Sequence, residues 1–137
     1  AATDGSRDRF YDWIARSPYG DAESAAPAPG YIAPPLDGIW ATAPYLHNGS
    51  VPSLATLLSP EDRPVYWRHL RPRAYDRDAV GWRFERQESG QEAQADPDLR
   101  RRIYDTTRHG YGNGGHRYGA NLGEADRAAL IAYLKTL

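Results

Sequence analysis

Apolar side chains recur at helical spacing in two longer stretches and one short one. Acidic residues open the clearest of them, residues 124–136, and its apolar side chains share one helical face: Leu130, Tyr133, Leu134 and Leu137. Residues 6–16 repeat the pattern with an aromatic face that includes Trp13. A short helix is expected over residues 53–58, either capped by Ser53 or beginning at Pro52 after a cap at Ser50.

Between these helices the hydrophobic pattern is broken by Pro and Gly. Residues 21–35 are rich in Ala and Pro, which favours an extended strap. In residues 65–84 Arg alternates with aromatic side chains, and short extended pieces with a small hairpin are expected. Residues 85–100 are polar and predict a mobile excursion or an inserted loop. The pattern therefore predicts a mostly α, loop-rich fold without an extensive sheet.

Residues 38–54 form a loop sequence that contains side chains favouring burial. These side chains are Ile39, Trp40, Tyr45, Leu46 and Val51. His47 lies in the middle, directly before an Asn-Gly pair suited to a tight turn. A rigid aromatic loop of this kind is typical of the wall of a cofactor pocket. A single His in a loop is nevertheless more often a hydrogen-bonded structural residue than a ligand.

The second stretch with candidate chemistry is residues 104–119, which is rich in glycine. The glycines at 110, 112, 114, 115 and 119 allow positive φ angles and a close approach to the backbone. His116 lies inside this run, between Gly115 and Tyr118. The run is not a nucleotide-binding loop, because it lacks the Gly-Lys-Ser/Thr ending and no strand pattern precedes it.

Composition narrows the function classes. The chain has 137 residues, which predicts a single domain, and a net charge of −1, which argues against nucleic acid as the main partner despite the many Arg residues. No apolar run is long enough to span a membrane. The chain contains no Met, so we expect a processed chain or a fragment, in a periplasmic or extracellular setting. It contains no Cys either, which excludes disulfides and thiolate metal sites.

Residues 35–54 resemble the C-terminal haem domain of dihaem c-type cytochromes. That group includes the bacterial cytochrome c peroxidases and, closer still, the rubber-oxygenase-like proteins. The peroxidases read Pro-Tyr-Phe-His-Asp-Gly at this place, and this chain keeps Pro44, Tyr45, His47 and Gly49. Residues 112–119 resemble the Gly-Asn-x-x-Gly-His-Glu-Tyr-Gly segment of the same group, with Arg117 where Glu is usual. The likeness covers residues 31–82 and 104–137.

The resemblance implies a haem c and a set of residues around it. His116 would be the distal axial ligand, with His109 as the runner-up, because the chain lacks the Met that is the usual sixth ligand in such domains. The pocket wall would consist of Trp40, Pro44, Tyr45, His47, Asn48 and Tyr118, with His47 near a propionate and not on the iron. Without Cys, covalent attachment must come from a Cys-x-x-Cys-His segment on another segment or chain.

The resemblance thus implies one cytochrome c-like domain segment, residues 1–137, that lacks the haem-attachment part. Its parts would be an N-terminal helix and strap (1–35), a haem-wall loop and helix (36–58), an insertion (59–103), and a ligand loop with a closing helix (104–137).

The function expected from the resemblance is electron transfer within a dihaem peroxidase-like or oxygenase-like redox protein, together with a redox partner protein. The resemblance is compatible both with a chain that is part of a haem peroxidase or oxygenase and with a chain that serves electron transfer alone. A rival interpretation is a haem-free interaction or structural subunit that keeps the fold, and a small Arg-rich binding module is a third. Retention of both His residues in intact frames favours the haem interpretation. Aromatic residues such as Trp40, Trp67 and Trp82 also exceed what a loop-rich chain covers easily, so we expect the chain to be unstable alone.

Overall fold

The computed structural model describes residues 12, 13, 16, 34–70, 72 and 74–137. The chain divides into two units, residues 1–33 and 34–137. In the first unit the backbone N–H of Arg16 donates to the carbonyl of Asp12 over 3.2 Å, as in one turn of helix. The remainder of the helix expected over residues 6–16, and the strap up to residue 33, lie outside the described residues.

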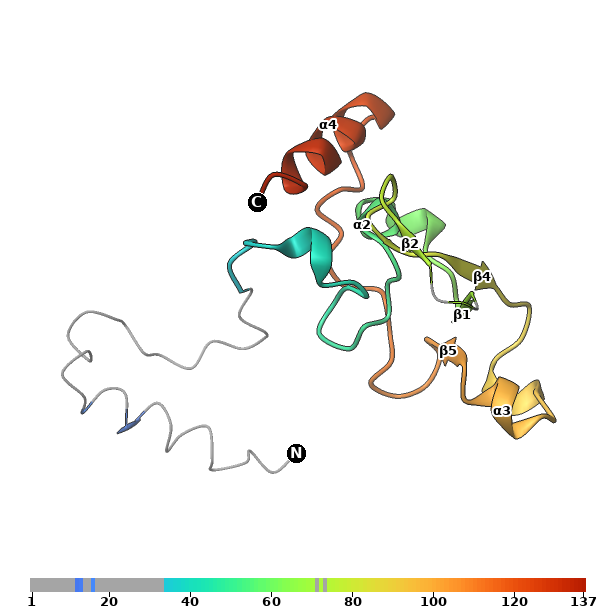
Figure 1. Cartoon of the computed structure of the whole chain (residues 1–137). Coiled ribbons are helices and arrows are strands. Elements are labelled where there is room, and N and C mark those ends of the chain that lie inside the picture. Colours follow the sequence, from blue (N-terminus) through green and yellow to red (C-terminus); the bar gives the residue numbers. More distant parts are fainter. Residues whose placement is uncertain (1–11, 14–15, 17–33, 71, 73) are drawn as a thin grey trace. The chain divides into compact units, whose positions relative to one another are not determined.

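The second unit combines short helices with two small antiparallel sheets (Figure 1). Its helical elements are η1 (Ile39–Ala41), α2 (Leu54–Leu58), η2 (Pro60–Asp62), η3 (Gln91–Ala93), α3 (Pro97–Arg100) and α4 (Glu124–Leu134). Its strands are β1 (Tyr66–His69), β2 (Tyr75–Asp76), β3 (Gly81–Trp82), β4 (Phe84–Arg86) and β5 (Ile103–Asp105). One sheet has the order β4-β1-β5, and the other pairs β2 with β3.

The prediction of a mostly α fold is wrong, because short strands account for much of the regular structure of the described residues. Strand β1 pairs Trp67 with Arg86 of β4 on one side and with Tyr104 of β5 on the other. The Arg–aromatic run that includes β1 therefore forms the centre of a sheet, as expected of aromatic side chains on a pleated surface. The hairpin expected within residues 65–84 is present as the pairing of Tyr75 with Trp82.

The polar stretch 85–100, for which the sequence predicts a mobile excursion or an inserted loop, contains regular structure. It includes the end of β4, the 3₁₀ turn η3 and the single helical turn α3. The side chain of Asp96 caps α3 by accepting hydrogen bonds from the backbone N–H groups of Asp98 (2.7 Å) and Leu99 (3.4 Å), and Pro97 occupies the first turn. These local polar contacts order the stretch without the apolar burial that a hydrophobic pattern would reveal.

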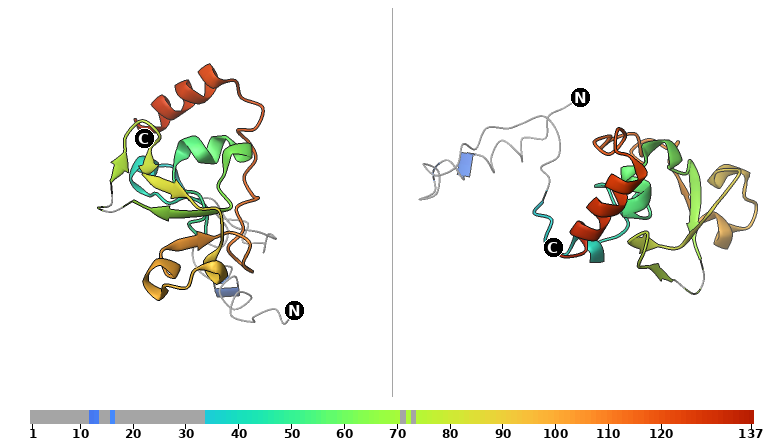
Figure 2. Two further views of the ribbon diagram at one scale, coloured as in Figure 1. Left: turned by 90° about the vertical axis from the view of Figure 1, so that its right-hand side faces the viewer. Right: turned by 90° about the horizontal axis from the view of Figure 1, so that it is seen from above.

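Helices α2 and α4 confirm the two helix predictions that fall on described residues. Ser53 is the N-cap of α2, and its side-chain oxygen accepts a hydrogen bond from the backbone N–H of Thr56 over 3.2 Å. This settles the alternative between Ser53 and Ser50. Helix α4 begins at Glu124 and lies over α2, where the two helices pack together (Figures 1 and 2). None of the helices in the described part of the chain is both long and apolar enough to cross a membrane.

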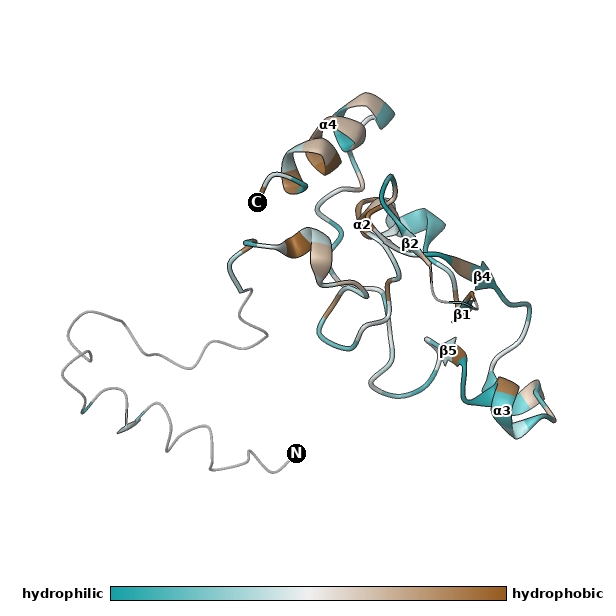
Figure 3. Cartoon of the chain, in the orientation of Figure 1, coloured by the Kyte–Doolittle hydropathy of each residue, from teal (hydrophilic) through white to brown (hydrophobic). Residues whose placement is uncertain are grey.

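The hydrophobic core lies where α2, α4 and the loop before α2 meet. Its buried members are Tyr45, Val51, Leu54, Leu57, Val80 and Leu134. Ile39 of η1 and Leu130 and Ile131 of α4 pack against it, and Figure 3 shows apolar residues on both elements. Gly81 permits the close approach of β3 to the start of α2, because a Cβ there would lie 2.3 Å from the carbonyl oxygen of Pro52.

The aromatic side chains divide between this interior and the surface. Trp67 is only 1% exposed and Tyr45 only 4%, so the chain covers both by itself. Trp82 is half-buried, and its indole N–H donates to the carbonyl of Ala43 over 2.9 Å. The exposed aromatic side chains of the described residues are Trp13, Trp40, Tyr111, Tyr118 and Tyr133, of which Tyr118 is the most exposed at 87%. Of the aromatic residues expected to be hard to cover, Trp67 is therefore buried, Trp82 half-buried and Trp40 exposed.

Candidate functional site

The first candidate stretch folds into a tight loop over residues 44–51, here called the His47 loop. Tyr45 and Val51 close it through backbone hydrogen bonds of 2.7 and 3.2 Å, and Gly49 donates to the carbonyl of Leu46 over 3.0 Å. Leu46 and Gly49 both have positive φ angles, 67° and 68°, which the tight turn requires. The turn leaves His47 exposed at the tip of the loop.

Asn48 joins the His47 loop to the glycine-rich stretch 110–119, here called the glycine loop. Its side-chain amide donates to the carbonyls of Gly110 (3.0 Å) and Gly112 (2.9 Å), and its amide oxygen accepts from the backbone N–H of Ser50 (3.1 Å). The Ser50 hydroxyl donates to the same Gly112 carbonyl over 3.3 Å. Two stretches that lie about sixty residues apart are therefore side by side, and both can be followed in Figure 1.

Two stacked aromatic side chains of the sheet form hydrogen bonds with the backbone of the His47 loop. The indole N–H of Trp67 donates to the carbonyl of Ser50 over 3.1 Å, and the hydroxyl of Tyr104 donates to the carbonyl of Asn48 over 2.7 Å. The two rings stack with centroids 5.3 Å apart and 13° between their planes. Strands β1 and β5 thus position the two side chains that bind the backbone of the His47 loop.

Arg63 fastens the glycine loop to the end of α2. Its guanidinium donates to four carbonyls, those of Asn113, Gly115 (2.5 Å), Leu57 (2.8 Å) and His116 (2.7 Å). Arg63 is only 8% exposed. Burial, followed by the positive charge of Arg117, lowers the pKa of Arg63 below its usual value, while Glu61 acts in the opposite direction. A guanidinium nevertheless stays charged at neutral pH.

The carbonyl of His116 is bound by Arg63, and the residue itself is exposed. The residue has a positive φ of 52°, which is uncommon for a side chain other than Gly. Its ring meets that of Tyr118 edge to face, with centroids 5.0 Å apart. Partial burial, and then the charge of Arg63, lower the pKa of His116, so that its neutral form is favoured. A neutral imidazole is the form that binds metals.

The backbone of the glycine loop is open to the approach of another group. A Cβ built on Gly110, Gly112, Gly114 or Gly115 would meet nothing within 4 Å. Gly119 differs, because a Cβ there would lie 2.7 Å from the carbonyl oxygen of Leu58. Four glycines of the loop therefore have free space where a side chain would be, and Gly119 packs against α2. An exposed imidazole, an uncovered Tyr118 ring and an open backbone fit one face of a flat haem, whereas the chain offers no residue for its covalent attachment.

The remaining residues expected at the site have different surroundings. Trp40 is exposed at the surface, and its carbonyl accepts a hydrogen bond from the Tyr75 hydroxyl. Pro44 is half-buried behind a cis peptide bond. Tyr45 is a core residue whose hydroxyl donates to the carbonyls of Ile39 (3.0 Å) and Val80 (3.2 Å), and burial raises the pKa of that hydroxyl. The alternative ligand His109 is exposed one residue before the glycine loop.

Sequence reasoning missed the residues that join the two loops. Arg63, Ser50, Trp67 and Tyr104 were not among the expected site residues, although each contacts the His47 loop or the glycine loop. Arg63 has no local signal of burial, because it follows Glu61 and Asp62 in a polar turn after α2, where an Arg is normally solvated. No local pattern indicates that its partners lie fifty residues further on.

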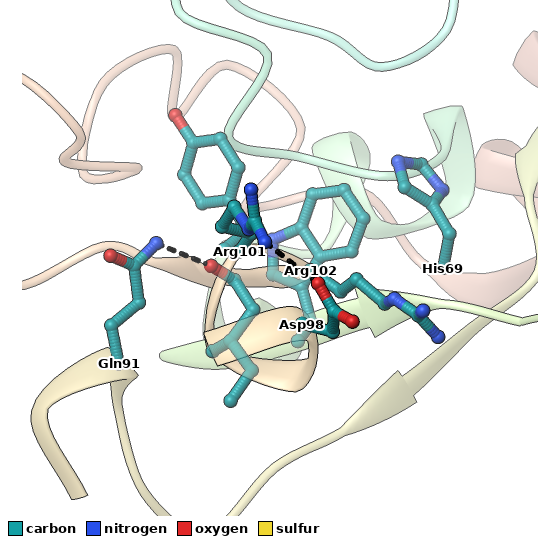
Figure 4. A pocket seen from close by; sticks show the side chains of 8 residues that line it. His69, Gln91, Asp98, Arg101 and Arg102 are labelled. Carbon is teal, nitrogen blue, oxygen red and sulfur yellow. Dashed lines mark hydrogen bonds and ion pairs between the residues drawn. The ribbon is translucent and has the colours of Figure 1, made fainter. Parts of the chain in front are cut away.

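A separate cavity of about 490 Å³ lies next to the sheet (Figure 4). Its lining residues are Trp67, His69, Gln91, Asp98, Arg101, Arg102, Ile103 and Tyr104. Arg101 pairs with Asp98 over 2.7 Å, and the side-chain amide of Gln91 donates to the carbonyl of Ile103 over 2.8 Å. No residue of the His47 loop or the glycine loop lines this cavity, although Trp67 and Tyr104 line it and also bind the His47 loop. In the described part of the chain, no group of three or more His, Cys, Asp or Glu residues could hold a metal ion.

Comparison with known proteins gives a family match for part of the chain. Residues 30–68 match the family described as RoxA-like, cytochrome c-like. This match supports a cytochrome c-like domain of the RoxA group over that segment and a haem-related redox role.

Two curated relatives are similar over most of this chain, and both come from Sinorhizobium fredii (strain NBRC 101917 / NGR234). "Uncharacterized protein y4iJ" is 41% identical over 130 residues, which cover 86% of this chain and 20% of the relative. "Uncharacterized protein y4iM" is 38% identical over 120 residues, which cover 77% of this chain and 27% of the relative. The chain spans about a fifth to a quarter of the length of the curated relatives it matches.

The family match contains the His47 loop and Arg63, while the glycine loop lies outside it. The structure connects the two, because Asn48, Ser50 and Arg63 all bind carbonyls of the glycine loop. The matched segment and His116 therefore belong to one structural site.

Proposed function

We propose that this segment supplies the axial imidazole of His116 and part of the pocket wall to a haem c attached elsewhere, in an electron-transfer site. One observation carries the proposal: the cytochrome c-like segment binds the His116-bearing glycine loop through Asn48 and Arg63. A haem held by His116 and a second imidazole would supply one-electron transfer, at a lower potential than Met/His ligation gives.

The individual residues take different parts in this proposal. His116 would hold the iron through a ring nitrogen, and Tyr118, whose exposed ring contacts that of His116, would bind the haem beside it. The open glycine backbone allows close approach of the flat ring. Trp40 and His47, both exposed, contribute to the edge of the pocket, with His47 as a hydrogen-bond donor to a propionate. Pro44, Tyr45 and Asn48 act behind the surface by holding the His47 loop in shape.

The wider setting belongs to the same proposal. The Cys-x-x-Cys-His segment that attaches the haem is part of another segment of the protein or of a partner chain. A second haem with peroxidase-like or oxygenase-like chemistry, a redox partner protein, and a periplasmic or extracellular location complete it. The support is the RoxA-like match together with the absence of Cys from this chain.

A second candidate function is a haem-free interaction or structural segment that keeps the fold. The contacts of Tyr45, Asn48 and Arg63 favour it, because each of these side chains has an internal structural partner that requires no cofactor. The exposed aromatic ring of Tyr118 would then contact a protein surface. An absorption spectrum of the purified full-length protein separates the two candidates, because a haem-free protein has no Soret band.

The experiment that tests the proposed ligand compares His116→Ala with His47→Ala in the haem-loaded, full-length protein. His116→Ala should convert one six-coordinate low-spin haem to a five-coordinate, high-spin form, because no other side chain on this loop replaces the imidazole. His47→Ala should shift the reduction potential and leave the low-spin spectrum unchanged. A low-spin spectrum that survives His116→Ala but not His47→Ala would assign the ligand to the other loop.

A further inference from the structure

Arg63 is a buried cation whose charge is directed at backbone carbonyls. In the described part of the chain no carboxylate lies within ion-pair distance of its guanidinium, and its Nε atom is buried without a hydrogen-bond partner. Charged groups of this kind are rarely buried unless they form strong hydrogen bonds. Arg63 forms them with four carbonyl oxygens, three of which belong to the glycine loop.

The glycine loop requires hydrogen bonds of this kind to order its backbone. Residues 112–116 contain three glycines and form no helix or strand, so ordering them costs more backbone entropy than ordering most sequences. The short stretch between the carbonyls of Asn113 and His116 is held by one rigid guanidinium, and the Asn113 side chain adds a hydrogen bond to the carbonyl of Pro64 over 2.9 Å. Arg63 and Pro64 together fix both the backbone and one side chain of the loop.

The last carbonyl that Arg63 binds in the glycine loop is that of His116, the proposed haem ligand. The carbonyl of His116 is bound by Nη2 of Arg63 over 2.7 Å, and the φ of His116 is positive. A bond to that carbonyl fixes the orientation of the peptide that follows His116 and therefore the direction in which its Cβ leaves the backbone. Without the hydrogen bond from Arg63, His116 would favour a negative φ, as residues other than Gly do, and its imidazole would point in another direction.

We propose that Arg63 is a positioning residue, which holds the glycine loop so that the imidazole of His116 is preorganised for axial ligation. This inference rests on the proposed function. Arg63 touches neither iron nor macrocycle in this account and acts only through the carbonyls of Asn113, Gly115 and His116. The segment that matches the cytochrome c-like family thereby controls a ligand that lies outside the matched range.

The planar fork of Arg is essential to this role. Its two terminal nitrogens each bind two carbonyls, those of Asn113 and Gly115 on Nη1 and those of Leu57 and His116 on Nη2. A Lys ammonium keeps the charge but is a compact point donor on a flexible chain, so it cannot bridge all four. Arg63→Lys therefore tests geometry separately from charge, and Arg63→Gln removes both.

The experiment uses the full-length, haem-loaded protein and measures two quantities in each variant. Hydrogen exchange of peptides covering residues 110–119 reports the order of the loop, with peptides of α4 as the internal check of folding. The rate at which added imidazole displaces the protein ligand reports how well His116 is positioned. Arg77→Gln is the matched control, because Arg77 is exposed and forms no hydrogen bond or ion pair with the described residues.

Arg63→Lys should accelerate both exchange of the glycine loop and displacement by imidazole about tenfold, because at least one carbonyl bond per nitrogen is lost. Arg63→Gln should exceed that effect, and Arg77→Gln should change neither rate. Unchanged displacement in both Arg63 variants, with His116→Ala still abolishing the low-spin spectrum, would overturn the positioning role while leaving the proposed ligand intact. If Arg63→Gln fails to fold, the Arg63→Lys result alone decides.

The two hypotheses fail in different ways. If His116→Ala leaves the spectrum low-spin, the proposed ligand is wrong, and the inference about Arg63 is overturned with it, whatever happens to loop exchange. If His116→Ala acts as expected and Arg63→Lys displaces faster than Arg77→Gln, both stand.

Discussion

Asn48→Ala removes the side chain that joins the two candidate loops. Three hydrogen bonds disappear: two donated to the carbonyls of Gly110 and Gly112, and one accepted from the backbone N–H of Ser50. Their consequences differ. Gly110 and Gly112 are exposed, so water replaces the lost donor at their carbonyls, whereas Ser50 is fully buried and its N–H is left without an acceptor.

These contacts give an expected loss of local stability. Each of the two exposed bonds contributes about 0.5 kcal/mol, the low end for neutral hydrogen bonds, and the stranded N–H costs about 1.5 kcal/mol. The sum is about 2.5 kcal/mol, which corresponds to roughly 70-fold in the opening equilibrium of the glycine loop. Asn48→Asp keeps the acceptor for Ser50 and loses the two donors, so it should cost about 1 kcal/mol plus the repulsion between its carboxylate and the two carbonyls.

The assay is hydrogen exchange of peptides that cover residues 110–119 in the full-length protein. Asn121→Ala is the control, since Asn121 is exposed and forms no hydrogen bond with the residues that the structure describes. Exchange should be fastest in Asn48→Ala and slower in Asn48→Asp, and in Asn121→Ala it should equal that of the unmodified protein. Equal exchange in Asn48→Ala and Asn121→Ala would refute the claim that Asn48 joins the loops.

Two further predictions concern packing and pH. Gly81→Ala should lower the free energy of unfolding in denaturant by about 3 kcal/mol, because the new Cβ would lie 2.3 Å from the Pro52 carbonyl oxygen. Gly114→Ala should change that free energy little, because its Cβ would meet nothing within 4 Å, and equal effects of the two variants would contradict the packing argument. Burial would raise the pKa of Asp105, but hydrogen bonds from Thr107 and Gln91, and the charge of Arg108, outweigh burial and lower it. The stability that this carboxylate contributes is therefore present above the unfolded pKa of about 3.9 and lost as the pH falls through the folded value. Asp105→Asn should thus destabilise the protein more at pH 7 than at pH 2, and a pH-independent effect would count against the assignment.

Local signals explain which parts of the fold could be predicted. The helix at 54–58 depends on the Ser53 cap and on apolar spacing, and α4 depends on an acidic first turn with an apolar face. All of these can be read within a dozen residues. The sheet β4-β1-β5 could not be predicted in this way, because β1 pairs with residues 84–86 and 103–105, far along the chain. A mostly α fold was the wrong conclusion for that reason.

The candidate site shows the same division. The sequence indicated both loops through their glycines, aromatic residues and histidines, and the structure places them against each other. The contacts that join them come from side chains without a local signature. Asn48 was expected at a pocket wall and binds the other loop, and Arg63 was not expected at the site at all. Tyr45 illustrates the opposite case, since an aromatic residue in a family motif lies in the core.

The most direct test of the central claim is chemical rescue of His116→Gly by imidazole. Glycine suits the positive φ of residue 116, so the loop keeps its shape while the side chain is removed. In the haem-loaded, full-length protein, His116→Gly should have a high-spin spectrum that returns saturably to the six-coordinate low-spin spectrum as imidazole is added. A low-spin spectrum of His116→Gly in the absence of imidazole would contradict the account, because the axial ligand would then come from another residue.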